Sequence, residues 1–123
     1  MRPIKKNISE VPLIEGRGGK ISVLISPKTA GSTQFILGVS SLEAGGEVNN
    51  HVHDYSYEAF YVVEGEGLIS FAEFESIPFC QGDAVHVPKG VAHKIKNTGS
   101  EEMKVVFTAS PLAPSPELGH REV

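Results

Sequence analysis

The sequence has little cysteine, and that limits its covalent chemistry. Cys80 is the only cysteine, so no disulfide can form within the chain, and we expect a cytoplasmic protein. No histidine or lysine neighbours Cys80 in the sequence to activate its sulfur. We therefore interpret Cys80 as a packed thiol and not as a nucleophile.

Excess positive charge and long apolar runs are also missing. The net charge is −4, and the basic residues form no stripe, which argues against nucleic acid as a partner. The basic start of the chain, residues 1–7, has no apolar stretch behind it. We expect neither a signal peptide nor a membrane span.

Helical periodicity and internal repeats are absent as well, while short strand-like runs recur. A chain of 123 residues has the length of one domain and can bury roughly two-thirds of its unfolded surface. The apolar runs, many of them separated by glycine or proline, are residues 21–25, 35–39, 60–63, 68–71, 84–87 and 105–107. Short apolar runs separated by such turn residues predict an all-β sandwich or barrel.

We expect one domain over residues 1–123, with a barrel core at about 20–110. The first nineteen residues form a preceding segment, with a loop at 17–19. The proline-rich tail, residues 111–123, is expected to be extended. It is either frayed, or it lies over the barrel or over a neighbouring subunit. His120 in this tail is expected to be exposed and not a further ligand.

Three histidines and a carboxylate stand where one metal ion could gather them. His51 and His53 share a face if their segment is a strand, because side chains alternate across a strand. Glu58 opens the next strand-like run, and a short bend could bring it beside them. His93 follows a Pro-Lys-Gly turn and shares a face with Ile95 and Asn97, whereas the intervening lysines belong in water. The alternative is that these histidines bind no metal and are either exposed or hydrogen-bonded within the core.

Imidazole and carboxylate groups are ligands for first-row metals. The set therefore predicts one divalent transition metal, which could be Fe, Mn, Ni, Co or Zn. If such an ion were octahedral, four protein ligands would leave two positions open. Open positions distinguish catalytic metal sites from structural ones.

Both segments together resemble the motifs of the cupins. The first motif is Gly45, five residues, His51-x-His53, four residues, Glu58, six residues and Gly65. The second is Gly82, five residues, Pro88-x-Gly90, two residues, His93, three residues and Asn97. The resemblance implies an antiparallel jelly-roll β-barrel, a cupin-like double-stranded β-helix, with His51, His53, Glu58 and His93 as metal ligands. It does not imply one reaction.

Around the site we predict a substrate pocket walled by inward apolar side chains. Phe60, Val62 and Phe71 are the first candidates, with Leu37, Val105 and Phe107 as further ones; plain core packing is the alternative for each. Tyr57 and Tyr55 could donate hydrogen bonds to a substrate or could cover the bend. His86 is either a base behind the ligands or a residue facing solvent.

The sequence favours a mononuclear metalloenzyme acting on a small organic molecule, either a dioxygenase or a non-redox lyase or isomerase. The alternative is a non-catalytic cupin that binds a sugar or carboxylate, or that regulates a partner. Residues 60–63 are apolar on both faces. We read this as burial of the outer face by a second sheet layer or by a partner subunit, and we predict a homodimer.

Overall fold

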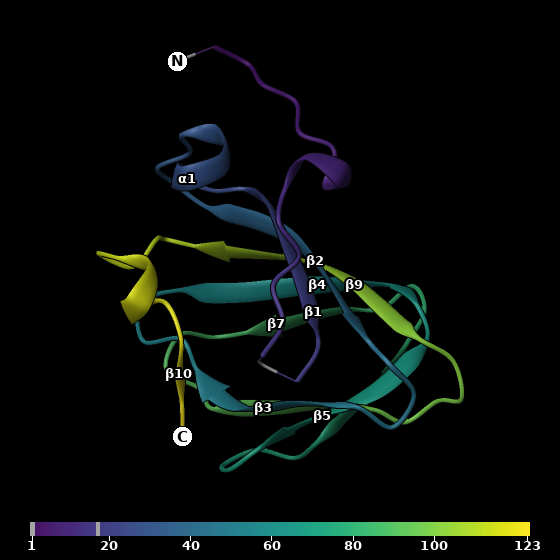
Figure 1. Cartoon of the computed structure of the whole chain (residues 1–123). Coiled ribbons are helices and arrows are strands. Elements are labelled where there is room, and N and C mark those ends of the chain that lie inside the picture. The colour runs from purple at the N-terminus through teal and green to yellow at the C-terminus, as the bar shows by residue number, and fades with distance from the viewer. Residues whose placement is uncertain (1, 17) are drawn as a thin grey trace.

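The computed structural model describes residues 2–16 and 18–123 and contains two facing antiparallel sheets (Figure 1). The first has the order β1 (Lys20–Ile25), β2 (Ile36–Leu42), β9 (Met103–Ser110), β4 (Tyr57–Glu64) and β7 (Ala84–Val87). The second has the order β10 (Arg121–Glu122), β3 (Glu47–Val52), β8 (His93–Asn97), β5 (Glu66–Phe71) and β6 (Ile77–Cys80). Every strand pair is antiparallel.

Helical structure in the described ranges is confined to three short elements. They are the 3-10 turn η1 (Ile8–Glu10), the α-helix α1 (Pro27–Ala30) and the 3-10 turn η2 (Pro116–Leu118). Nowhere in residues 2–16 or 18–123 is there a helix with the length and apolarity needed to cross a membrane. The predicted all-β jelly-roll fold is confirmed. Part of the loop predicted at 17–19 lies outside the described residues, since it includes Arg17.

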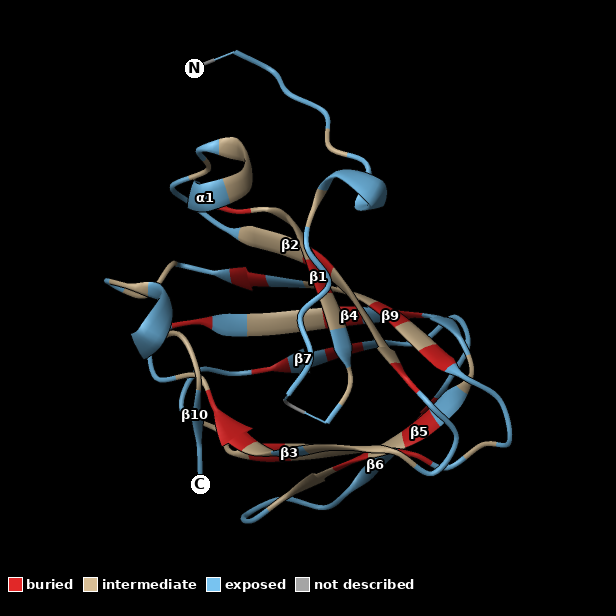
Figure 2. Ribbon diagram, in the orientation of Figure 1, coloured by how far each residue is buried: buried red, intermediate tan, exposed pale blue. Residues whose placement is uncertain are grey.

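The core lies between the sheets because their strands alternate. On β4, Phe60 and Val62 are 3% and 0% exposed, whereas Tyr61 between them is 51% exposed. Figure 2 shows the buried segments on the strands of both sheets. The core residues are Leu42, Phe60, Val62, Ile69, Phe79, Val85, Val87, Met103 and Val105. Burying each large side chain contributes about 1.5–3 kcal/mol.

The second sheet layer covers only the inner face of β4. Tyr61 and Val63, which point the other way, remain exposed in the single chain. Of the two explanations for this doubly apolar run, burial of its outer face by the second sheet is therefore wrong. Burial by a partner subunit stays a prediction.

Two glycines of the motifs fix the turns that place the site. Gly65 joins β4 to β5 with φ +91°, and a Cβ there would lie 2.8 Å from the Cα of Met103. Gly90, with φ +81°, donates its backbone N–H to the carbonyl of His53 at 2.9 Å. Both positions favour glycine, because side chains strain a positive φ. The second contact ties the turn before β8 to the end of β3.

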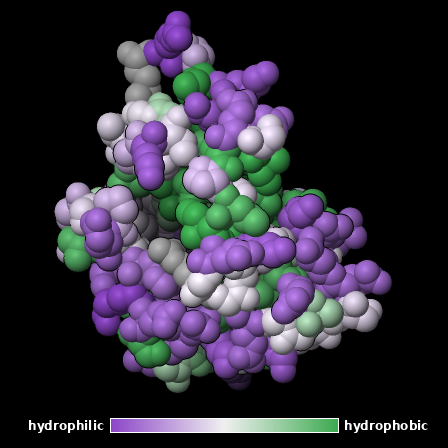
Figure 3. Space-filling model, viewed as in Figure 1, coloured by the Kyte–Doolittle hydropathy of each residue, from purple (hydrophilic) through white to green (hydrophobic). Residues whose placement is uncertain are grey.

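The two ends of the chain behave differently. The chain that precedes η1 projects away from the barrel (Figure 1), whereas the stretch after η1 returns to β1, where Ile14 and Ile21 exchange backbone hydrogen bonds at 2.8 Å. Leu13 and Ile14 nevertheless keep exposed side chains. Hydrophobic side chains gather across the middle of the face on which β1 lies (Figure 3). The proline-rich tail instead lies over the barrel, because η2 leads into β10, which pairs with β3. This is one of the placements that the sequence left open for the tail.

Candidate metal centre

The four predicted ligands converge from three strands of the two sheets. His51 lies on β3, and His53 follows the last residue of that strand. His93 opens β8 and is the direct cross-strand partner of His51. Glu58 comes from β4 in the facing sheet. Because β3 and β8 are neighbours and β4 faces them, the cluster lies between the sheets.

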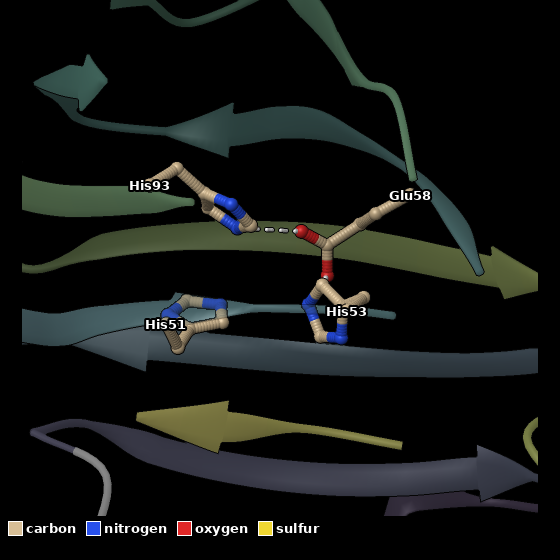
Figure 4. Close-up of side chains that lie close together, drawn as sticks. All are labelled: His51, His53, Glu58 and His93. Atoms are coloured by element: carbon tan, nitrogen blue, oxygen red, sulfur yellow. Dashed lines mark ion pairs between the residues drawn. The ribbon is translucent and has the colours of Figure 1, made fainter. Parts of the chain in front are cut away.

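Side-chain distances show how closely these groups meet. Glu58 Oε1 is 3.3 Å from His93 Nε2, and Glu58 Oε2 is 3.5 Å from His53 Nε2 (Figure 4). The ring centroids of His51 and His93 are 4.2 Å apart. One ligand atom from each of the four residues lies within 4.8 Å of every other. His51 is 5% exposed and His93 is fully buried.

Each histidine is oriented by a backbone carbonyl. Nδ1 of His51 contacts the oxygen of Asn49 at 2.7 Å, and Nδ1 of His93 contacts that of Val91 at 3.0 Å. Nδ1 of His53 contacts the oxygen of Gly119 at 2.8 Å. A carbonyl can only accept, so Nδ1 must carry the proton in each ring. The lone pair of the neutral imidazole is then on Nε2, the arrangement typical of histidine ligands.

The donor set fits a metal ion. The lone pairs of the Nε2 atoms and the oxygens of Glu58 are all acceptors, and acceptors that face one another repel unless a cation lies between them. In the described part of the chain, the buried Nε2 of His93 makes no hydrogen bond, although such atoms are normally satisfied. A proton or a metal ion would satisfy it.

The protonation states suit ligation. Burial, followed by the nearby charge of His93, lowers the pKa of His51 to about 4, so this ring is neutral at pH 7. Burial alone would raise the pKa of Glu58, but without a metal ion, protons on Nε2 of His53 and His93 let both rings donate to the carboxylate, and this attraction outweighs burial and holds that pKa at about 2. The carboxylate is therefore ionised at neutral pH. Neutral imidazole and ionised carboxylate are the forms that bind metals.

A cavity of about 190 Å³ opens beside the cluster. Its polar end contains His51, His53, Glu58 and His120. The apolar wall includes Ile21, Ile36, Phe60, Ile95, Val105 and Phe107. Among the described residues that line it, none is lysine or arginine. Since a cavity of about 150 Å³ can hold benzene, this one has room for a ring-sized apolar group next to the ligands.

The predicted wall residues divide between the cavity and the core. Phe60, Val105 and Phe107 line the cavity. Val62 shares the inward face of β4 but is fully buried in the core. Phe71 packs against the core and makes an edge contact with Phe74, with ring centroids 6.2 Å apart. Val62, Phe71 and Leu37 are not among the lining residues.

The polar candidates lie outside the cavity. Tyr57 is 47% exposed, and its ring is parallel to that of the exposed His86, with centroids 5.9 Å apart. Tyr57 and His86 are thus on the outer face of the first sheet, where His86 faces solvent. Tyr55 is 40% exposed. A contact between Tyr57 and a substrate stays a prediction, and this geometry does not favour it.

Two expectations about single residues were wrong. His120 is half-buried and lines the cavity, with its ring stacked on His51 at a centroid distance of 4.6 Å. Nothing in the sequence indicates this, because the contact depends on the path of the tail. Cys80 is exposed at the end of β6, so it is not packed. The negative charge of Asp83 raises the pKa of its thiol.

Comparison with known proteins defines the class. The family model described as Cupin domain matches residues 38–109, which is more than half of the chain and includes all four predicted ligands. The chain belongs to the cupin family.

Two curated proteins and one solved structure are similar to this chain over most of its length. Polyketide synthase CurC of Streptomyces cyaneus is 36% identical over 120 residues, which cover 98% of this chain and 77% of CurC. Tetracenomycin polyketide synthase protein TcmJ of Streptomyces glaucescens is 36% identical over 113 residues, which cover 92% of this chain and 75% of TcmJ. The structure of a predicted oxalate decarboxylase from Thermotoga maritima has a TM-score of 0.74 and 24% identity, covering 89% of this chain and all of that one. At this identity, the likeness to the Thermotoga maritima structure shows a shared fold and nothing more.

Proposed function

We propose that this protein is a mononuclear metalloenzyme that acts on a small, largely apolar molecule derived from a polyketide. The observation that carries the proposal is the convergence of three carbonyl-anchored histidines and Glu58 at the polar end of an apolar cavity. The likeness to CurC and TcmJ supports the substrate class.

In this proposal, His51, His53, Glu58 and His93 hold one divalent transition metal. When bound, such an ion supplies Lewis acidity and, for a redox-active metal, a site for dioxygen. The carbonyls of Asn49, Val91 and Gly119 keep the histidine rings oriented. Carbonyl anchors of this kind fix the ring and its tautomer before substrate arrives.

The rest of the chain binds and shields the substrate. Phe60, Val105 and Phe107 exclude water from an inserted ring, which strengthens polar interactions at the ligand end. The lack of lysine and arginine among the described lining residues favours a neutral substrate over a sugar phosphate or a dicarboxylate. A keto or phenolic oxygen would then be the group nearest to Glu58 and the histidines.

Two reaction types are compatible with such a site, oxygen-dependent cleavage and non-redox lyase or isomerase chemistry. We favour a substrate with one or more rings for either. The exposed, unbridged thiol of Cys80 is consistent with a cytoplasmic location.

The test is to incubate metal-loaded protein with a panel of polyketide-derived phenols and diketones. An oxygen electrode and mass spectrometry then follow oxygen uptake and product formation. We expect turnover by the wild-type chain, none by His93→Ala, and unchanged turnover by His86→Ala, whose histidine lies on the outer face. Tight binding of a compound without turnover of any compound would contradict the enzyme hypothesis and favour a non-catalytic binding protein.

A further inference from the structure

The end of the chain is fastened to the strand that supplies two ligands. Residues 116–123, here called the C-terminal strap, include β10, which pairs with β3 through Arg121 and Val52 and through Glu122 and His51. Val123 donates its N–H to the carbonyl of Asn50 at 3.1 Å. These contacts hold the strap across the end of β3, as Figure 1 shows.

Side chains add to the fastening. Arg121 meets Asp54 with two contacts, Nε to Oδ2 at 2.6 Å and Nη2 to Oδ1 at 3.1 Å. Asn49 donates from Nδ2 to the carboxylate of Glu122 at 2.9 Å. A bidentate arginine–carboxylate pair fixes geometry as well as contributing attraction. Both Asp54 and Asn49 lie within two residues of a ligand histidine, so these contacts hold the strap beside the cluster.

The strap touches two of the ligands themselves. The carbonyl of Gly119 accepts from Nδ1 of His53 at 2.8 Å. The ring of His120 stacks on His51 at 4.6 Å with 30° between the planes, and its centroid lies 5.9 Å from that of His53. The other two histidines take their anchoring carbonyls from Asn49 and Val91, only two residues away in the sequence. His53 takes its carbonyl from 66 residues away.

The same segment forms part of the cavity wall. Pro116, Gly119 and His120 line it together with the ligand residues. One short segment therefore orients His53, packs on His51 and limits the space beside them. A tail that only covered the barrel would not need to touch both histidines.

We infer that the C-terminal strap is a working part of the site, with Gly119 and His120 as positioning residues for His53 and His51. This inference rests on the proposed function and deepens it, because it makes the end of the chain a determinant of metal affinity and of pocket size. Partners that orient metal ligands typically change affinity 10–100-fold when lost.

The test measures Co²⁺ affinity by competition with a chromophoric chelator. We expect a chain ended after Ser115 to bind Co²⁺ about 10–100-fold more weakly than the full chain, and His120→Ala about 10-fold more weakly. His120→Phe keeps a ring against His51 and should bind close to the wild-type level. His86→Ala, an exposed histidine on the outer face, is the matched control and should be unchanged.

A second readout separates positioning from general stability. NMR of the metal-free full chain should show His53 protonated on Nδ1, and the shortened chain should show both tautomers. Equal Co²⁺ affinity in the full chain, the shortened chain and His120→Ala would overturn the role of the strap and leave the metal site standing. A full chain that binds no Co²⁺ would overturn both. If circular dichroism shows the shortened chain unfolded, the comparison of His120→Ala with His120→Phe decides.

Discussion

Each histidine of the cluster donates a hydrogen bond from Nδ1 to a backbone carbonyl. Its other ring nitrogen, Nε2, is then turned toward the remaining ligands. The three Nδ1 atoms contact backbone carbonyls at 2.7, 2.8 and 3.0 Å. Backbone oxygens are suitable anchors because no side-chain rotation can move them away. The orientation of the rings is therefore a property of the backbone of β3, of the turn before β8, and of the C-terminal strap.

Replacing Glu58 with Gln tests the carboxylate as a ligand. The amide keeps an oxygen donor but loses the charge, so we expect weaker metal binding, with a smaller loss than any histidine-to-alanine change causes and a larger effect on reactivity. Metal affinity and turnover are the measurements. Glu64→Gln is the control, since that carboxylate lies on the same strand but pairs with Lys104 at the surface. Unchanged affinity and activity in Glu58→Gln would count against Glu58.

Replacing Asp83 with Asn tests the environment of Cys80. Asp83 raises the pKa of the thiol, which lowers the thiolate fraction at a given pH, and the thiolate is the reactive form. We expect Asp83→Asn to speed alkylation by iodoacetamide at pH 8 and to move the pH–rate curve to lower pH. The same rate and the same curve in both proteins would show that Asp83 does not control this thiol.

Alternation along single strands made much of the site predictable. The shared face of His51 and His53 and the inward direction of His93 follow from strand parity and from the flanking lysines. The alternation of side chains shows which face of a strand a residue is on, but not whether it lines a cavity or packs in the core. For this reason Val62 was expected in the pocket wall and is instead in the core. Parity also does not give the path of a proline-rich tail, so the place of His120 could not be foreseen.

Asn97 shows how one residue joins several elements. This buried residue at the end of β8 donates from Nδ2 to the carbonyls of Leu42 at 2.9 Å and Glu101 at 2.8 Å. Its Oδ1 accepts from the N–H of Gly99 at 2.9 Å. The second motif contains Asn97, but the sequence alone assigned it only to a face. The structure shows that it ties β8 to the end of β2 and to the turn before β9.

Removing that side chain should destabilise the fold without touching the ligands. Asn97→Ala leaves the buried carbonyl of Leu42 without its hydrogen bond, which costs about 1–3 kcal/mol. We expect the free energy of unfolding in urea to fall by that amount, while Lys96→Ala, exposed on the same strand, changes it little. A drop below about 0.5 kcal/mol would mean that water replaces the lost hydrogen bonds.

Strands with strong apolar runs were predictable, whereas short or interrupted ones were not. The runs at 21–25, 60–63 and 105–107 became β1, β4 and β9. β6 contains Pro78 and has a single buried residue, Phe79, so its own sequence carries little strand signal. β10 has only two residues. It is a strand because β3 offers it an edge.

In the molecule as a whole, the outer surface of β4 presents large apolar side chains that the rest of the described chain does not cover. Tyr57, Tyr61 and Val63 are 47%, 51% and 38% exposed. Large apolar side chains exposed along one face of a strand are compatible with an interface. We therefore retain the prediction of a homodimer in solution.

Light scattering at micromolar concentration tests this prediction. We expect a mass twice that of the 13.2 kDa chain, and we expect Tyr61→Lys with Val63→Lys to shift the mass toward one chain. Lys96→Ala, an exposed position on β8 of the second sheet, is the control and should keep the wild-type mass. A single-chain mass for the wild type would contradict the prediction.

We propose above that His51, His53, Glu58 and His93 hold one metal ion. Elemental analysis of protein purified without an affinity tag or chelator, both anaerobically and in air, tests it most directly. We expect close to one equivalent of a transition metal per chain, and the loss of that metal in His93→Ala with the β-sheet circular dichroism spectrum retained. Full metal occupancy in His93→Ala, or a wild-type chain that holds no metal and takes up none on reconstitution, would contradict it.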